Sequence, residues 1–472
     1  MSDAGPPATI GGGGPVRVAV AVGCAVAVWA AIAIPARATV GARTTADEPQ
    51  YLLSALSLAQ DRDLHIGDEL ADEAYRPFHE VELPVQTQPL DDGRVVSPHD
   101  PLLPALLAVP MAVGGWAAAK AMLAALGGVL AGLLVWTAHR RFAVPLPVAA
   151  LTVLAFGTTA PLSAYATQVY PELPAALAVT VAIAASTGRR RPVDLAVVAT
   201  AVAALPWLGV KYAPVAAALV SVAVGYLVAD HRRRALTALL GGLAAAALVY
   251  LVAHRLLYGG WTVYAAGDHF TGGELTVMGQ DPDRLGRSRR LLGLLLDRGF
   301  GLAAWMPGYL LAVPAIAVLV RRRPTGWTAL VAPLAAGWAT ATWVALTMHG
   351  WWWPGRQVVV VVPCLVLAVA WWAGRVRAVR PWVAVTGVVG AVNWAWLVVE
   401  VLDRRRTLIV DFEMTANPLY RAWRVVLPDY RSPGLADWAL QTGWIVVLGL
   451  AMALAVRTTR RRSPAGVPTG RS

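Results

Sequence analysis

Long apolar segments recur along the whole chain of 472 residues, and they restrict its fold more than any other feature. A helix crosses a hydrocarbon layer of about 30 Å with roughly 17–25 residues, and most of these segments reach that length. Hydrophobic residues make up 57% of the chain and charged residues only 14%, so one globular core could not hide the apolar side chains. The segments do not alternate in polarity, which argues against a β-barrel. The sequence therefore predicts an all-α polytopic membrane protein.

Twelve apolar segments are predicted to span the membrane. They are 16–34, 116–138, 144–162, 173–185, 195–210, 214–228, 236–257, 302–320, 327–348, 358–373, 382–402 and 438–456. The fourth and fifth are short for a span. The first has a single base, Arg17, at its start and no clear cleavage site of small residues after it, so we interpret it as a retained helix and not as a signal peptide.

Basic residues cluster in alternate connections between the segments. The clusters are His139-Arg140-Arg141, Arg189-Arg190-Arg191, His231 to Arg234, Arg321-Arg322-Arg323, Arg375 to Arg380, and Arg460-Arg461-Arg462. Because cytoplasmic loops carry an excess of Lys and Arg, this pattern predicts that both termini lie in the cytoplasm. Arg404-Arg405-Arg406 breaks the rule. The Ala-, Val- and Arg-rich composition suggests a bacterial source, so the expected location is the bacterial inner membrane. Because the basic residues lie in short clusters between apolar segments, the net charge of +12 reflects membrane topology, and no nucleic-acid partner is expected.

This topology divides the chain into parts and places its long polar segments outside. We expect a disordered cytoplasmic tail over 1–15, a transmembrane core over 16–373 with an outer loop over 36–101, C-terminal transmembrane helices over 374–456 with an outer loop over 403–437, and a cytoplasmic tail over 457–472. Cys24 and Cys364 both fall within predicted spans, so neither a disulfide nor a zinc site is expected. Any chemistry is expected on the outer side.

The first outer loop holds an acidic pair that has two interpretations. Asp47 and Glu48 follow Thr44-Thr45-Ala46 and precede Pro49, and apolar residues from Tyr51 onward recur at helical spacing. This pattern predicts an amphipathic helix along the membrane surface. The acids are then helix-capping residues. Alternatively, a carboxylate at the membrane boundary acts as a general base on an acceptor hydroxyl or amine.

Several segments together resemble the GT-C superfamily of integral membrane glycosyltransferases. They are Asp47-Glu48-Pro49-Gln50-Tyr51-Leu52, Ser97-Pro98-His99-Asp100-Pro101, Tyr170-Pro171-Glu172, Pro206 to Tyr212, Asp297 to Leu302, and Trp351-Trp352-Trp353-Pro354-Gly355-Arg356. The resemblance is strongest to the glycosyltransferase family 39-like branch of protein O-mannosyltransferases and aminoarabinose transferases. At Asp100 this chain departs from the small residue expected there. The segment after 382 matches nothing specific.

The resemblance implies an inverting transfer of a hexose or pentose from a polyprenyl-phosphate sugar, and it implies roles for individual residues. Asp47 is expected to be the catalytic base, with Glu48 as its partner or as a residue that orients the acceptor. Glu172 is expected to bind sugar hydroxyls or a cation, although it is also typical of a helix cap. Lys211 and Arg356 are expected to bind the phosphate, while Lys211 could instead snorkel to the interface.

Three further residues complete the candidate substrate-binding set. Trp353 is expected to stack on a sugar, although three consecutive tryptophans are also typical of an interfacial belt. Tyr51 and His99 are included because both belong to the motifs above, although His99 is also typical of a plain surface histidine. No metal ligands are predicted, and the need for a divalent cation is left open.

The sequence therefore predicts a membrane glycosyltransferase that acts at the outer face on an envelope glycan, lipid or protein, in contact with membrane lipids. The alternative is a transporter or flippase of a lipid-linked saccharide. Carriers usually place charged residues in the middle of spans, whereas Glu400 is nearly the only clear acid inside one here. Glycine motifs that bind nucleotides are absent from the sequence, which fits a lipid-linked donor.

Overall fold

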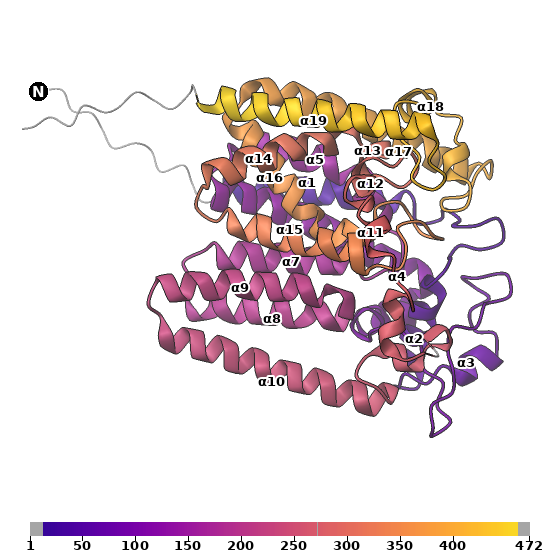
Figure 1. Ribbon diagram of the computed structural model, residues 1–472. Coiled ribbons are helices and arrows are strands. Elements are labelled where there is room, and N and C mark those ends of the chain that lie inside the picture. The colour runs from indigo at the N-terminus through magenta and orange to yellow at the C-terminus, as the bar shows by residue number, and fades with distance from the viewer. Residues whose placement is uncertain (1–12, 271, 461–472) are drawn as a thin grey trace, which may run out of the picture.

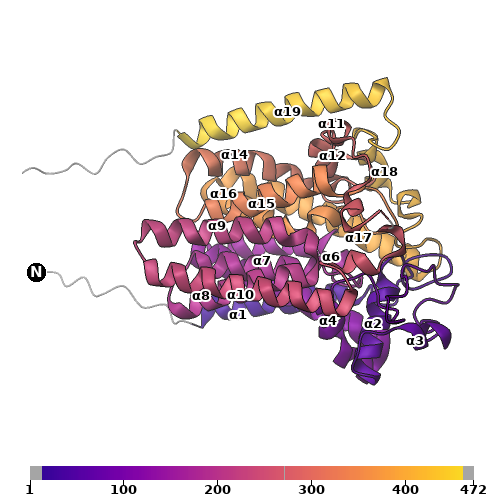
Figure 2. The same ribbon diagram turned by 60° about the horizontal axis from the view of Figure 1, so that its bottom comes forward.

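The computed structural model describes residues 13–270 and 272–460. Long helices lie side by side in a bundle, and short helices and loops gather at one end of it (Figure 1). The first described helix begins at the other end of the bundle, and the last described helix ends there (Figures 1 and 2). Both ends of the described chain therefore lie on the same side of the bundle. Residues 1–12 of the predicted tail over 1–15, and residues 461–472 of the predicted tail over 457–472, lie outside the described residues.

Each of the twelve predicted spans contains a helix. The helices are α1 Gly14–Ala31, α4 Leu102–Phe142, α5 Leu146–Gly157, α7 Glu172–Ser186, α8 Pro192–Leu208, α9 Ala213–Ala229, α10 Arg233–Tyr258, α14 Ala312–Arg322, α15 Thr328–Ala339, α16 Val362–Arg375, α17 Arg380–Leu402 and α19 Leu435–Arg460. Seven helical stretches among the described residues are long and apolar enough to cross a membrane by themselves. The chain is an all-α polytopic membrane protein, as predicted.

The remaining helices are short. They are α2 Glu48–Gln60, α3 Gly67–Ala71, α6 Leu162–Tyr165, η1 Val210–Tyr212, η2 Val263–Ala266, η3 Asp268–Phe270, η4 Glu274–Met278, α11 Arg284–Arg287, α12 Arg290–Leu296, α13 Leu302–Trp305, η5 Pro307–Leu311, η6 Thr340–Val344, η7 Arg356–Val361, η8 Arg377–Val379, η9 Phe412–Met414 and α18 Pro418–Arg424. The described residues contain no extended strand, only two isolated β-bridges.

Helix α4 begins fourteen residues before the predicted span at 116–138 because the chain is already helical from Leu102. A kink separates the two parts: Gly114 and Gly115 leave helical geometry, and Gly115 has φ 61° and ψ −154°, which only glycine adopts without strain. The part before the kink is 102–113, directly after the outer loop. Helix α2 packs against α4, as the predicted interfacial helix would.

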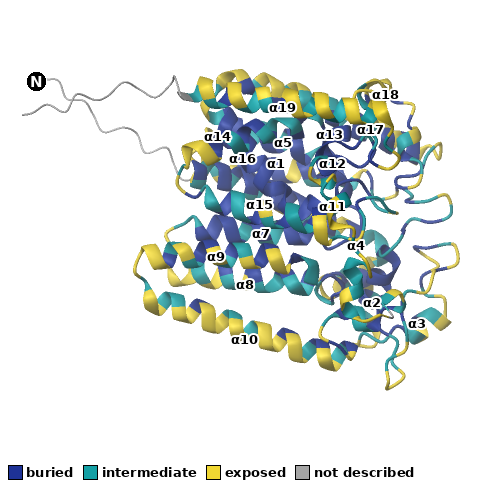
Figure 3. Ribbon diagram, viewed as in Figure 1, coloured by how far each residue is buried: buried dark blue, intermediate teal, exposed yellow. Residues whose placement is uncertain are grey.

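Among the long helices the most buried is α16, in the centre of the bundle (Figure 3). Helices α10 and α19 lie at the edges and expose large apolar side chains, among them Leu248, Leu256 and Leu450. Exposed leucines are costly in water but not in lipid, so the edge helices are suited to a hydrocarbon surrounding. The tail predicted from residue 457 is still helical as far as Arg460.

Candidate active site

Asp47 immediately precedes α2, where the capping interpretation placed it, but its side chain makes no capping hydrogen bond. Instead Asp47 Oδ2 accepts a hydrogen bond of 2.6 Å from Arg356 Nη2, at the start of η7. His99 Nε2 lies 3.7 Å from the same oxygen. The acid is therefore held toward a buried guanidinium and not toward its own helix.

Arg356 continues the ion pairing to a second acid. Its Nε donates to Glu172 Oε1 at 2.9 Å, and Lys211 Nζ donates to that same oxygen at 2.7 Å. Four sequence-predicted residues, Asp47, Arg356, Glu172 and Lys211, thus form one chain of alternating charge, which we call the ion-pair chain. They come from four elements, the start of α2, η7, the start of α7, and η1.

The middle of the ion-pair chain is buried, and both of its ends are partly exposed. The Glu172 side chain is fully buried and that of Arg356 is 8% exposed, whereas 23% of Asp47 and 29% of Lys211 are exposed. Glu172 Oε2 is buried and has no hydrogen-bond partner among the described residues. A ligand hydroxyl could satisfy this acceptor, because buried polar atoms are normally paired.

Aromatic rings surround the guanidinium. The centre of the Arg356 guanidinium lies 4.2 Å from the Tyr170 ring centroid and 4.9 Å from that of Trp352. Tyr51 packs edge-on against His99, with ring centroids 4.6 Å apart. Tyr170 and Trp352 were not among the predicted site residues, although both lie within motifs that pointed to the site.

Trp353 does not line the site. Its ring is fully buried and packs against Trp305, Trp394 and Phe412, so it has no free face for a sugar. Its backbone oxygen accepts a hydrogen bond from the Tyr165 hydroxyl at 2.6 Å. The prediction of a stacking platform at Trp353 is therefore corrected: the neighbouring Trp352 is the one beside Arg356.

Glu48 is fully buried and faces away from Asp47's partners. Its two carboxylate oxygens accept hydrogen bonds from the backbone N–H groups of Thr45 at 3.2 Å and Val169 at 2.8 Å. Burial raises the pKa of Glu48, an effect that the Lys120 ammonium opposes. Glu48 therefore joins the loop before α2 to the segment before Glu172.

Burial would raise the pKa of Asp47, but the Arg356 guanidinium and the His99 ring more than offset it. The net result is a pKa well below the ordinary value of 3.8. Asp47 is therefore ionised at neutral pH. It can accept a proton only from a group on which positive charge is developing. A divalent cation at this position would have to displace Arg356 from Asp47 and Glu172.

Asp100, the departure from the family motif, connects three elements. One oxygen accepts from the backbone N–H of Val210 at 3.1 Å, and the other accepts from the Tyr250 hydroxyl at 3.2 Å and lies 3.1 Å from His254 Nε2. Val210 directly precedes Lys211. Asp100 thereby links the segment that carries His99 to η1 and to α10, a role that the sequence did not reveal.

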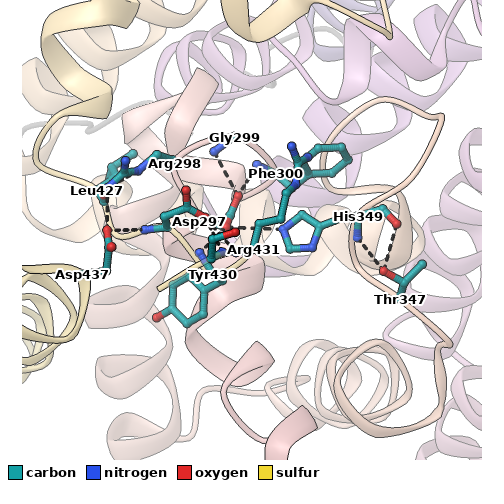
Figure 4. Close-up of polar contacts among 12 residues, drawn as sticks. Asp297, Arg298, Gly299, Phe300, Thr347, His349, Leu427, Tyr430, Arg431 and Asp437 are labelled. Carbon is teal, nitrogen blue, oxygen red and sulfur yellow. Dashed lines mark hydrogen bonds and ion pairs between the residues drawn. The ribbon is translucent and has the colours of Figure 1, made fainter. Parts of the chain in front are cut away.

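A second polar cluster joins three loops at the same end of the bundle (Figure 4). Asp297 accepts hydrogen bonds from the backbone N–H groups of Gly299, Phe300 and Tyr430, and it lies 3.5 Å from His349 Nε2. These contacts keep the pKa of Asp297 low despite its burial.

Within this second cluster, Arg298 pairs with Asp437 at 2.5 Å. The loop over 403–437 is thus tied to the segment after α12. Asp297 of that segment lies beside His349, which belongs to the segment before Arg356.

No family model matches the sequence, and no curated protein matches it. The structure is similar to the crystal structure of ArnT from Cupriavidus metallidurans bound to undecaprenyl phosphate, with a TM-score of 0.53 and 15% sequence identity, over 96% of this chain and 73% of the ArnT chain. At this identity the likeness concerns the fold. The chain therefore has a fold similar to that of ArnT over nearly its whole length, and its resemblance to the GT-C membrane glycosyltransferases is confirmed at that level.

Proposed function

We propose that the protein is a membrane glycosyltransferase that transfers one sugar from a polyprenyl phosphate to an envelope glycan, lipid or protein at the outer face. The observation that carries this proposal is the ion-pair chain, in which Asp47 and two cations meet at the start of the interfacial helix α2. Transfer from a lipid phosphate requires a base for the acceptor and positive charge for the departing phosphate. The ion-pair chain supplies both.

In the proposed reaction, Asp47 takes the proton from the acceptor hydroxyl or amine. Within the described part of the chain its Oδ2 is engaged by Arg356, whereas no hydrogen bond involves its Oδ1. The acceptor atom then attacks the anomeric carbon from the face opposite the phosphate, and the bond from that carbon to the phosphate oxygen breaks. The electron pair leaves with the polyprenyl phosphate, and the sugar configuration inverts.

Arg356 and Lys211 are proposed to stabilise the charge on the departing phosphate. A guanidinium matches phosphate oxygens in a fork, and the exposed end of the ion-pair chain at Lys211 adds a second cation. Glu172 holds both cations in place and offers its unpaired Oε2 to a sugar hydroxyl. The phosphate thus partly replaces the carboxylates of the ion-pair chain as the negatively charged partner of Arg356 and Lys211.

The prenyl chain requires an apolar surface beside the site. A groove of about 1070 Å³ is lined by side chains of α12, α14, α15, α16 and α19, including Leu292, Ile316 and Met452. Helix α15, one wall of this groove, packs against η7, which begins at Arg356. We propose that the prenyl tail of the donor lies in this groove. The undecaprenyl phosphate bound in ArnT supports a ligand of this class.

The test compares the wild type with Asp47→Asn in detergent, using radiolabelled polyprenyl-phosphate sugars and envelope extracts as acceptor. Asp91→Asn is the matched control because Asp91 is an exposed acid in the same outer loop. Sugar transfer by the wild type and the control, but not by Asp47→Asn with equal folding, supports the proposal. If no donor is used and liposomes containing either protein move lipid-linked sugar equally well, the protein is a flippase and the proposal is wrong.

A further inference from the structure

Three carboxylates converge at the end of α2 remote from Asp47. Asp61 follows the last residue of α2, and Asp68 and Glu69 lie in the first turn of α3. One oxygen from each of the three lies within 4.8 Å of the others. Asp61 and Asp68 are exposed, whereas Glu69 is only 5% exposed.

The Glu69 carboxylate is an unusual buried group. Both of its oxygens are shielded from solvent, and neither has a hydrogen-bond partner among the described residues. Burying an ionised carboxylate without a partner is strongly unfavourable, more so than burying a neutral polar group. The three acids therefore require a positive charge or a proton among them.

No ion pair in the described part of the chain supplies such a positive charge, because none of the pairs there involves Asp61, Asp68 or Glu69. The acids also lie at the C-terminal end of α2, where Asp61 N–H donates to Ser57 O and the helix dipole is negative. The negative end of the α2 dipole and the three carboxylates thus favour a cation at the same point.

We infer that Asp61, Asp68 and Glu69 form a binding site for a divalent cation of the hard, oxygen-seeking class, with Ca²⁺ as the best fit. Ca²⁺ takes about six to eight oxygen ligands in flexible geometry, which three carboxylates with water or backbone oxygens can provide. The ligand set has neither sulfur nor imidazole, which Zn²⁺ prefers. An outward-facing site of this kind has a dissociation constant of about 10⁻⁴–10⁻³ M.

The site would act on the fold of the first outer loop. Helix α2 carries Asp47 at its beginning and Asp61 at its end, so a cation that joins Asp61 to α3 restrains the helix on which the proposed base lies. The competing explanation is a proton: burial, with the Asp68 carboxylate beside it, raises the pKa of Glu69 to about 8. A protonated Glu69 would need no metal, and the two explanations differ in their response to Ca²⁺.

The experiment measures binding of Ca²⁺ alone to the full chain, purified in detergent and freed of metal with a chelator. Calorimetric titration and the Ca²⁺-dependent rise in the unfolding temperature are recorded, with Mg²⁺ as comparison ion. The variants are Glu69→Gln and Asp61→Asn, and the matched control is Glu82→Gln, an exposed acid in the same loop. Each variant is compared with itself at zero Ca²⁺, so a change in its basal stability does not affect the result.

One Ca²⁺ per chain is expected in the wild type and in the control. Both ligand variants should bind it at least about tenfold more weakly, since even the loss of outer partners of a metal site costs about 10–100-fold in affinity. No binding by the wild type up to about 10 mM, well above the expected range, would exclude the site. Unchanged Ca²⁺ stabilisation in both ligand variants would also contradict it. None of these results depends on sugar transfer.

Discussion

Arg356 and Asp47 lie 309 positions apart in the sequence, and their side chains form an ion pair of 2.6 Å. The guanidinium also holds Glu172 through its Nε, so one side chain orients the proposed base and the proposed sugar-binding acid at once. The two-sided contact requires the planar fork of an arginine. A lysine at the same position has a single nitrogen and cannot reach both acids in this geometry.

We therefore expect Arg356→Lys to lower kcat by about 10²–10³-fold, the usual effect of removing one donor that stabilises a departing charge. The positive charge is kept, so the loss comes from geometry. Steady-state transfer assays with the donor found above would measure it. Arg76→Lys, which alters an exposed ion pair with Glu73, is the control and should leave kcat unchanged. A near-normal kcat in Arg356→Lys would rule out the proposed role of the guanidinium fork.

The low pKa of Asp47 predicts how activity depends on pH. Burial raises that pKa, and Arg356 and His99 bring it below 3.8, so the wild type should show no acid limb due to Asp47 between roughly pH 4 and pH 8. In Arg356→Met the burial remains without the cation, and the pKa of Asp47 should rise. The residual activity should then fall on the acid side at a higher pH than in the wild type.

The same lowered pKa has a consequence for stability. A carboxylate with a depressed folded-state pKa stabilises the fold above its unfolded pKa of about 3.9, and this contribution is lost as the pH falls through the folded value. The unfolding temperature of the wild type should therefore exceed that of Asp47→Asn at neutral pH, and the difference should shrink below about pH 4. A difference independent of pH would show that Asp47 ionisation does not stabilise the fold.

Glu48 should matter for stability more than for the chemical step. Glu48→Ala leaves the N–H groups of Thr45 and Val169 buried without an acceptor, at a cost of about 1–3 kcal/mol each. Glu48→Gln keeps one acceptor oxygen and should be intermediate. Thermal unfolding in detergent, followed by tryptophan fluorescence, would rank the three proteins. A Glu48→Ala protein as stable as the wild type but without activity would return Glu48 to the catalytic set.

Substitutions of the two adjacent tryptophans, Trp352 and Trp353, should have different effects. Trp353→Ala removes a fully buried ring from an aromatic cluster and should destabilise the fold by about 3–5 kcal/mol. Trp352→Ala removes a partly exposed ring from beside Arg356 and should leave the fold intact while raising the KM for the donor. Unfolding curves and KM values for both variants provide the check. The reverse pattern would mean that Trp353, and not Trp352, contacts the donor.

The sequence alone determined the class of fold and the position of most helices. Spans of apolar residues must be helical in lipid, because no water is present there to satisfy the backbone, so each of the twelve predicted segments contains a helix. The motifs that resemble the GT-C superfamily also indicated the ion-pair residues Asp47, Glu172, Lys211 and Arg356 individually. The kinked first part of α4 escaped prediction because 102–113 is too short to be recognised as a span.

Only the tertiary structure decided which of these residues meet and which of two neighbours faces the site. Consecutive side chains point in different directions, so Asp47 and Glu48 diverge at the start of α2, as do Trp352 and Trp353 in the loop before η7. No linear pattern reveals which of two neighbours turns inward. The ion-pair chain forms because α2, η1, α7 and η7 pack together, and that packing depends on contacts between distant segments, such as the bonds of Asp100 to Val210 and of Glu48 to Val169.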